Sequence, residues 1–213
     1  MNSLTVVHED ADLLVLDKPA GLLCVPGRGE DKQDCLSARA QARWPDALVV
    51  HRLDMATSGL VLMARHPAMQ RALGDAFAQR RVHKRYEAIV DGLLAVSDDW
   101  SLIEAPLTAD WPNRPRQKID AHKGKPSSTR WRVKRLLPDR DASHVWLEPL
   151  TGRSHQLRVH LLSIGHPILG DALYGSEAVR ERADRLLLHA SELAFAHPDD
   201  GRLLRFESTP PFA

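Results

Sequence analysis

Cysteine, aromatic residues and long apolar runs are all scarce in this chain of 213 residues. Its two cysteines, Cys24 and Cys35, are too few for a disulfide scaffold and are not spaced as zinc ligands. No apolar run approaches the roughly 20 residues needed to cross a bilayer, and the first residues lack the layout of a signal peptide. The sequence also contains no GxGxxG or P-loop pattern. We therefore expect a cytoplasmic protein with no membrane partner and no nucleotide cofactor.

The remaining composition is typical of a soluble globular enzyme, with 43% hydrophobic and 27% charged residues. The net charge is only +1, but the charges are separated along the chain. Residues 1–34 hold seven acidic and three basic residues, whereas residues 112–135 hold nine basic residues and one acidic residue, Asp120. Such a separation allows a basic face that binds phosphate groups. A solvated surface without a partner is the alternative explanation.

The most informative part of the sequence is a polar stretch, residues 51–59, followed at once by the apolar residues 60–64. The apolar run predicts a buried strand, and the polar stretch predicts a loop that leads into it. If this loop is locally extended, Arg52 and Asp54 point to one side and Leu53 to the other. Thr57 and Ser58 can bond to nearby backbone and hold the turn. A surface ion pair beside a turn would explain an isolated Arg-x-Asp equally well.

The string from His51 to Leu62 resembles the signature of the RluA family of RNA pseudouridine synthases, HRLD-x-x-TSG followed by aliphatic residues. The resemblance implies that Asp54 is the catalytic residue. It also implies that Arg52 fills the space that a flipped-out base leaves in the RNA. His51 and Thr57, in the same loop, are predicted to bind substrate together with Arg52.

Three further blocks resemble the same family. Residues 17–27 resemble its DKPAG-L-x-V-P-G block, which supports the catalytic loop. Tyr86 stands in a K-x-Y-x-A pattern, whose tyrosine lies against the target uridine; a strand aromatic on a half-buried face is the alternative. Residues 151–160 resemble the TGR-x-HQ-[IL]-R-x-H block, in which Arg153 is predicted to pair with Asp54 and keep it ionised. Leu187 is predicted to contact the substrate.

A metal site is the competing interpretation of the histidines. His155 and His160 are five residues apart, which on a helix places them about 140° apart around the axis. No Cys, Asp or Glu lies in their block to complete a site, so we expect no metal. A metal-dependent phosphodiesterase would use His51, Asp54, His155 and His160.

A proline-rich basic stretch, residues 105–118, is predicted to be an irregular loop. Arg114, Arg116 and Lys118 are predicted to bind RNA. Trp111 suits stacking on an unpaired base, although capping the core is the alternative. The D-W-P-N-R-P-x-Q-K string resembles short-chain family members that modify both ribosomal and transfer RNA.

Periodicity predicts strands over residues 4–9, 13–17, 86–90, 125–137, 143–150, 186–190 and 202–207. It predicts helices over residues 35–43 with Asp34 as cap, 66–79, 177–184, and from Ser154 as cap onward. The family resemblance implies a mixed α/β (α+β) fold, with a mainly antiparallel sheet flanked by helices. We expect one catalytic domain over residues 1–213, without a separate N-terminal RNA-binding module, acting as a monomer.

The predicted function is therefore isomerisation of specific uridines in stem-loops of 23S ribosomal RNA and a tRNA anticodon arm, without cofactor or metal. A synthase acting on ribosomal RNA only is one alternative. A non-catalytic RNA-binding protein is another, and it would predict disruption of the Asp54, Tyr86 or Arg153 blocks. All three blocks are intact.

Overall fold

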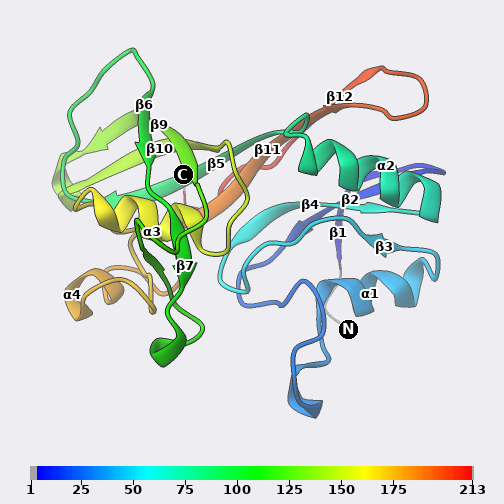
Figure 1. Ribbon diagram of the computed structural model, residues 1–213, viewed down its shortest axis with the longest axis horizontal. Coiled ribbons are helices and arrows are strands. Elements are labelled where there is room, and N and C mark those ends of the chain that lie inside the picture. Colours follow the sequence, from blue (N-terminus) through cyan, green and yellow to red (C-terminus); the bar gives the residue numbers. More distant parts are fainter. Residues whose placement is uncertain (1–3, 213) are drawn as a thin grey trace. The chain divides into compact units, whose positions relative to one another are not determined.

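The computed structural model describes residues 4–212 and divides them into two compact units (Figure 1). The first unit holds residues 4–84 and 190–211, and the second holds residues 85–189 together with Phe212. Strands that are mainly antiparallel, flanked by helices, confirm the predicted mixed α/β class. No helix among residues 4–212 has the length and apolar character needed to cross a membrane.

The first unit is built on strands whose order is β1-β2-β4-β11, with β12 beside β11 and β3 beside β4. The pairs β1–β2, β2–β4, β3–β4 and β11–β12 are antiparallel. The strands are β1 (Thr5–Glu9), β2 (Leu13–Lys18), β3 (Leu48–Val49), β4 (Ser58–Ala64), β11 (Leu188–Ala196) and β12 (Leu203–Glu207). The helices are the short η1 (Glu30–Lys32), α1 (Leu36–Arg43) and α2 (Pro67–Ala78).

The core of the first unit forms where α2 packs on the sheet. All seven residues of β4 are buried, as the apolar run predicts. Leu60 and Leu62 of β4 join Leu13 and Val15 of β2 and Leu73 of α2 in one apolar cluster. Because the strand that follows the 51–57 loop is fully buried, the end of that loop is fixed in place.

The second unit holds a sheet of order β5-β10-β9-β6, with antiparallel neighbours, and a separate hairpin, β7–β8. The strands are β5 (His83–Asp91), β6 (Ser101–Glu104), β7 (Leu107–Ala109), β8 (Gln117–Ile119), β9 (Ser128–Leu137) and β10 (Ala142–Pro149). The helices are η2 (Trp111–Asn113), η3 (Pro138–Arg140), α3 (Gln156–Ser163) and α4 (Glu177–Arg180). Helix α3 packs against β8, β9 and β10.

Two predicted helix caps are wrong, because the residue that follows each of them stands at the N-cap position. Helix α1 begins after Cys35, whose Sγ accepts from the Ala38 amide, while Asp34 pairs with Arg39 at 2.6 Å. Helix α3 begins after His155, which adopts a left-handed conformation with φ of 54°, and not after Ser154. In place of the predicted 177–184 helix, the structure has the shorter α4, and in place of the predicted 186–190 strand it has β11, which begins and ends later.

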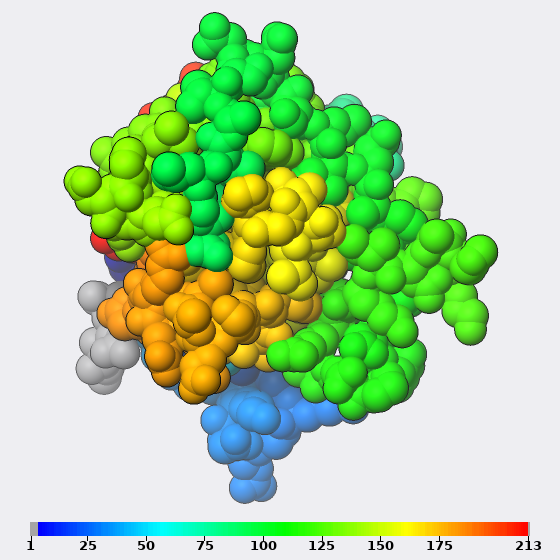
Figure 2. Space-filling model, turned by 90° about the vertical axis from the view of Figure 1, so that its left-hand side faces the viewer, coloured from blue at the N-terminus to red at the C-terminus, as the bar shows by residue number. Residues whose placement is uncertain are grey.

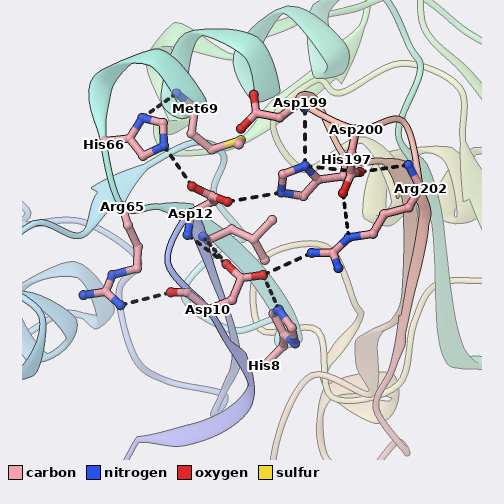
Figure 3. Close-up of polar contacts among 11 residues, drawn as sticks. His8, Asp10, Asp12, Arg65, His66, Met69, His197, Asp199, Asp200 and Arg202 are labelled. Atoms are coloured by element: carbon pink, nitrogen blue, oxygen red, sulfur yellow. Dashed lines mark hydrogen bonds and ion pairs between the residues drawn. The ribbon is translucent and has the colours of Figure 1, made fainter.

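A polar network ties the turns of the first unit together (Figure 3). Asp12, in the β1–β2 turn, lies 3.2 Å from Nε2 of His66 at the start of α2 and 3.7 Å from Nε2 of His197 after β11. Asp10 in the same turn lies 3.7 Å from the guanidinium of Arg202. These contacts join the β1–β2 turn to the start of α2 and to the segment that connects β11 and β12. Within the described part of the chain, no group of three or more His, Cys, Asp and Glu residues could hold a metal ion.

Candidate active site

Asp54 lies in a loop whose backbone is held on both sides of it. The Leu53 amide donates to Sγ of Cys24 at 3.2 Å, and the Leu53 side chain is buried. On the other side, the Met55 carbonyl accepts from the Gly21 amide at 2.8 Å. The Asp54 carbonyl itself accepts from a residue further along the loop, Thr57, at 3.1 Å. The half-buried Asp54 is thus fixed through its neighbours' backbone.

A buried lysine closes the base of this loop. Lys18 is fully buried, and its Nζ donates to the carbonyls of Pro19, Leu22 and Met55 at 2.9, 2.7 and 3.1 Å. A buried ammonium is tolerated when its donors are satisfied in this way. The prediction that the 17–27 block supports the loop is therefore confirmed.

Cys24 belongs to the same support. Burial raises the pKa of its thiol, and the charge of Asp54 adds to that effect. The thiol consequently remains neutral, and its sulfur serves as an acceptor for the loop backbone rather than as a nucleophile.

The ring of His51 contacts other residues of the first unit. Its Nε2 accepts from the Leu62 amide at 2.9 Å, so the ring proton is on Nδ1, and the ring stacks on Phe77 with centroids 4.5 Å apart. Burial lowers the pKa of His51 to about 3, and the charge of Lys84 contributes. The structure therefore assigns His51 a role in holding the loop to β4. Its predicted contact with substrate stays a prediction.

This neutral histidine gives a pH dependence to folding. In the unfolded chain His51 binds a proton below its ordinary pKa of 6.5, whereas in the fold it stays neutral down to about pH 3. The stability it contributes is complete above pH 6.5 and is lost as the pH falls from 6.5 toward 3. At pH 5 the loss amounts to about 2 kcal/mol.

The measurement is urea unfolding at pH 7.5 and pH 5.0. His51→Gln, whose amide oxygen can still accept from Leu62, should show a drop in the free energy of unfolding between these pH values that is smaller by about 2 kcal/mol. The exposed His122→Gln is the control and should match the unmodified protein. An equal drop in all three proteins would contradict the assignment.

Three other predicted site residues differ in the exposure of their side chains. Arg52 is exposed and able to meet a large ligand, as the prediction requires. Thr57 is only 2% exposed, so its side chain belongs to the interior of the loop. Leu187, in the second unit, is similarly buried, and its amide donates to the Leu169 carbonyl at 3.0 Å. The predicted substrate contacts of Thr57 and Leu187 remain untested.

Tyr86, in the second unit, lies on β5 opposite Leu147 of β10 and is half-buried. Strand alternation places it on the face of β5 opposite to that of Arg85 and Glu87. Both the predicted strand and the half-buried aromatic are therefore present. Neither of them tests the catalytic role of this tyrosine.

The two arginines of the 151–160 block have different environments. Arg153 is exposed, and its Nε donates to the Pro126 carbonyl at 3.4 Å. Arg158 is only 4% exposed, and its Nε and Nη2 donate to the carboxylate of Asp171 at 2.8 and 2.5 Å. Its guanidinium also lies over the ring of Tyr174. Sequence reasoning named only Arg153, because burial of Arg158 depends on a residue thirteen positions away.

The histidines of this block are bonded to protein groups. His160 bonds to the Thr129 hydroxyl at 2.9 Å and to the Ala105 carbonyl at 3.0 Å, and burial lowers its pKa. His155 bonds through Nδ1 to the hydroxyl of Tyr174 at 2.7 Å. Both rings thus have structural partners.

The basic stretch forms a hairpin, so the predicted irregular loop is wrong. Strands β7 and β8 pair from Leu107–Ile119 to Ala109–Gln117, and η2 makes up part of the tip. The tip closes with a hydrogen bond from the Asp110 amide to the Arg116 carbonyl at 2.9 Å. The predicted RNA-binding side chains are all exposed: Arg114, Arg116 and Lys118. Trp111 is 71% exposed, which excludes the alternative of a core cap.

The chain is similar to proteins of known families along nearly its whole length. The RNA pseudouridylate synthase family profile matches residues 12–163. The dual-specificity RNA pseudouridine synthase RluA of Escherichia coli K12 is 45% identical over 209 residues, covering 98% of this chain and 94% of that protein. The Yersinia pestis protein of the same name is 45% identical over 98% of this chain and 100% of its own length.

A solved structure, human RNA pseudouridylate synthase domain containing 1, aligns with a TM-score of 0.80 at 31% identity, covering 99% of this chain and 85% of its own. Human RNA pseudouridylate synthase domain containing 4 aligns with a TM-score of 0.75 at 23% identity. At that identity the second likeness shows the fold alone.

Proposed function

Since this chain belongs to the RNA pseudouridylate synthase family, we propose that it isomerises specific uridines in stem-loops of 23S ribosomal RNA and of a tRNA anticodon arm. The observation that carries this proposal is the identity of about 45% over 98% of the chain to relatives named dual-specificity RNA pseudouridine synthases. The protein would act as a cytoplasmic monomer, with no cofactor or metal.

In this reaction the glycosidic bond from the uracil nitrogen to the anomeric carbon breaks, and the uracil turns. Its carbon C5 then bonds to the anomeric carbon and loses its proton, while the former glycosidic nitrogen gains one. Asp54 is the proposed catalytic group, because a carboxylate can attack or stabilise an oxocarbenium-like centre. The backbone contacts of Leu53 and Met55 support this role, since they hold the carboxylate in position before substrate arrives.

A uridine in a folded stem-loop must leave its stack to reach such a group. We assign Arg52 to the space that the base vacates, and its exposure supports that assignment. Tyr86 would stack on the flipped uracil. Arg114, Arg116 and Lys118 would contact RNA phosphates.

The 151–160 block holds two candidates for the cation that keeps Asp54 ionised, Arg153 and Arg158. The sequence names Arg153, whose exposed charge is weakened by water. A buried and oriented guanidinium acts more strongly on a partly buried carboxylate. Arg158 has these properties in its pair with Asp171, so we propose it as a second candidate beside Arg153.

The test compares kcat/KM for two variants. Replacing Arg158 alone would leave Asp171 buried without its partner, so Arg158→Met is combined with Asp171→Asn. If Arg158 is the cation, this double variant should lose kcat/KM while Arg153→Met keeps it. A loss of kcat/KM in Arg153→Met alone would give the role to Arg153.

The choice of RNA is tested by separate incubation with transcribed ribosomal and transfer RNA stem-loops. Pseudouridine is mapped by carbodiimide treatment and primer extension. Dual specificity predicts a stop in both transcripts. A stop in ribosomal RNA alone would establish the second candidate, a ribosome-only synthase.

A further inference from the structure

Trp111 is an aromatic side chain held in water by a rigid support. It lies at the tip of the β7–β8 hairpin and is 71% exposed. In Figure 2 this green segment stands out from the surface beside the yellow α3. Exposing a large ring forgoes the free energy that burial would give, and a ring among basic side chains suits a stacking, phosphate-bearing partner.

The hairpin tip is internally bonded. The Asn113 amide donates to the Asp110 carbonyl at 3.0 Å, and the Asn113 side chain donates to the Asp110 carboxylate at 2.8 Å. The Arg116 amide donates to the Asn113 carbonyl at 3.0 Å. Trp111 is therefore presented by a fixed turn, which reduces the entropy lost on binding.

The hairpin is also fastened to the rest of its unit. The Gln117 amide donates to the hydroxyl of Tyr174 at 2.7 Å, and the same hydroxyl bonds to Nδ1 of His155. His155 immediately precedes α3. The hairpin that carries Trp111 thus has a defined position relative to the 151–160 block.

The surroundings of the ring select an anionic, aromatic partner. The guanidinium of Arg114 lies over one side of the Trp111 ring, which leaves the opposite side for a second planar group. Arg116, Lys118 and Lys123 are exposed on the same hairpin and its continuation. An apolar protein surface would gain nothing from these charges, whereas a nucleotide offers both a stacking base and a phosphate.

We propose that Trp111 is the stacking platform for an unpaired base of the substrate RNA other than the target uridine, with Arg114 supporting the ring from behind. This inference rests on the proposed function, because it takes RNA as the ligand. The platform contributes affinity and register, and leaves the chemistry to Asp54.

The experiment measures the affinity of a fluorescent stem-loop RNA at several salt concentrations for Trp111→Ala and Trp111→Phe. Loss of one base stack predicts an affinity about 5- to 150-fold weaker for Trp111→Ala, with an unchanged salt dependence. Trp111→Phe should retain most of the affinity, which excludes a general folding defect. The exposed helix residue variant Arg71→Ala is the control and should bind as the unmodified protein does.

The base is identified by replacing each unpaired nucleotide of the stem-loop, other than the target uridine, with an abasic one. One such replacement should weaken binding to the unmodified protein and leave binding to Trp111→Ala unchanged. Equal affinities of the Trp111→Ala and unmodified proteins would overturn the proposal. If the unmodified protein binds but forms no pseudouridine, the proposed function fails while the binding comparison still decides the role of Trp111.

Discussion

Asp54→Asn should reduce pseudouridine formation by about 10³-fold or more, as loss of a nucleophile does in other enzymes. Asparagine has nearly the shape of aspartate but carries no charge, so it can neither attack the anomeric carbon nor stabilise a positive centre there. The loop should keep its position, because it is held by backbone contacts of Leu53 and Met55. Thermal unfolding and RNA affinity are therefore expected to stay close to those of the unmodified protein.

A second aspartate provides a control that separates the loss of a charge from the loss of the catalytic group. Asp46 pairs with Arg65 at 3.1 Å on the surface of the same unit, so Asp46→Asn removes one charge without touching the loop. This control should retain full activity. Measurable turnover in Asp54→Asn at a rate near that of Asp46→Asn would remove Asp54 from the mechanism.

Gly59→Ala should lower the free energy of unfolding by about 3 kcal/mol or more, through backbone strain and overpacking together. Gly59 is the second residue of β4, just after the loop, and has φ of 110°, a conformation that residues with a Cβ rarely adopt. A Cβ there would lie 2.3 Å from the carbonyl oxygen of Ala190, which is backbone and cannot turn away. Urea unfolding at neutral pH measures the loss.

The chain offers a matched glycine for comparison. Gly74 lies inside α2, and a Cβ there would meet nothing within 4 Å. Gly74→Ala should raise the free energy of unfolding by about 0.5–1 kcal/mol, because alanine favours the helix. If both variants had the same stability, the close approach of Gly59 to Ala190 would not constrain the fold.

Elements with strong local signals were predictable from the sequence. The apolar run of residues 60–64 predicts β4, and Pro67 with its apolar stripe predicts α2, because both signals arise from neighbours along the chain. The hairpin over residues 107–119 was missed for the opposite reason. Its strands have three residues each, and hydrogen bonds to Tyr174 and Lys125 support them from further along the chain.

In the candidate site, too, some features were predictable from the sequence and others depend on the tertiary structure. The motif alone names Asp54, but the support of its loop by Lys18 depends on a hydrogen bond to Met55, 37 residues away. Sequence patterns cannot show that Arg153 is exposed while Arg158 of the same block is buried. The same limit applies to Thr57, whose burial became visible only with the tertiary structure.

The central claim is that Asp54-dependent isomerisation of uridine takes place in intact RNA. Its most direct test is release of tritium from stem-loop RNA carrying uridine labelled at carbon 5, followed by denaturing electrophoresis of the same sample. We predict release that saturates at the number of target uridines, from RNA of unchanged length. Absence of release from bound RNA, or release that persists in Asp54→Asn, would contradict the mechanism, and shortened RNA would indicate a phosphodiesterase instead.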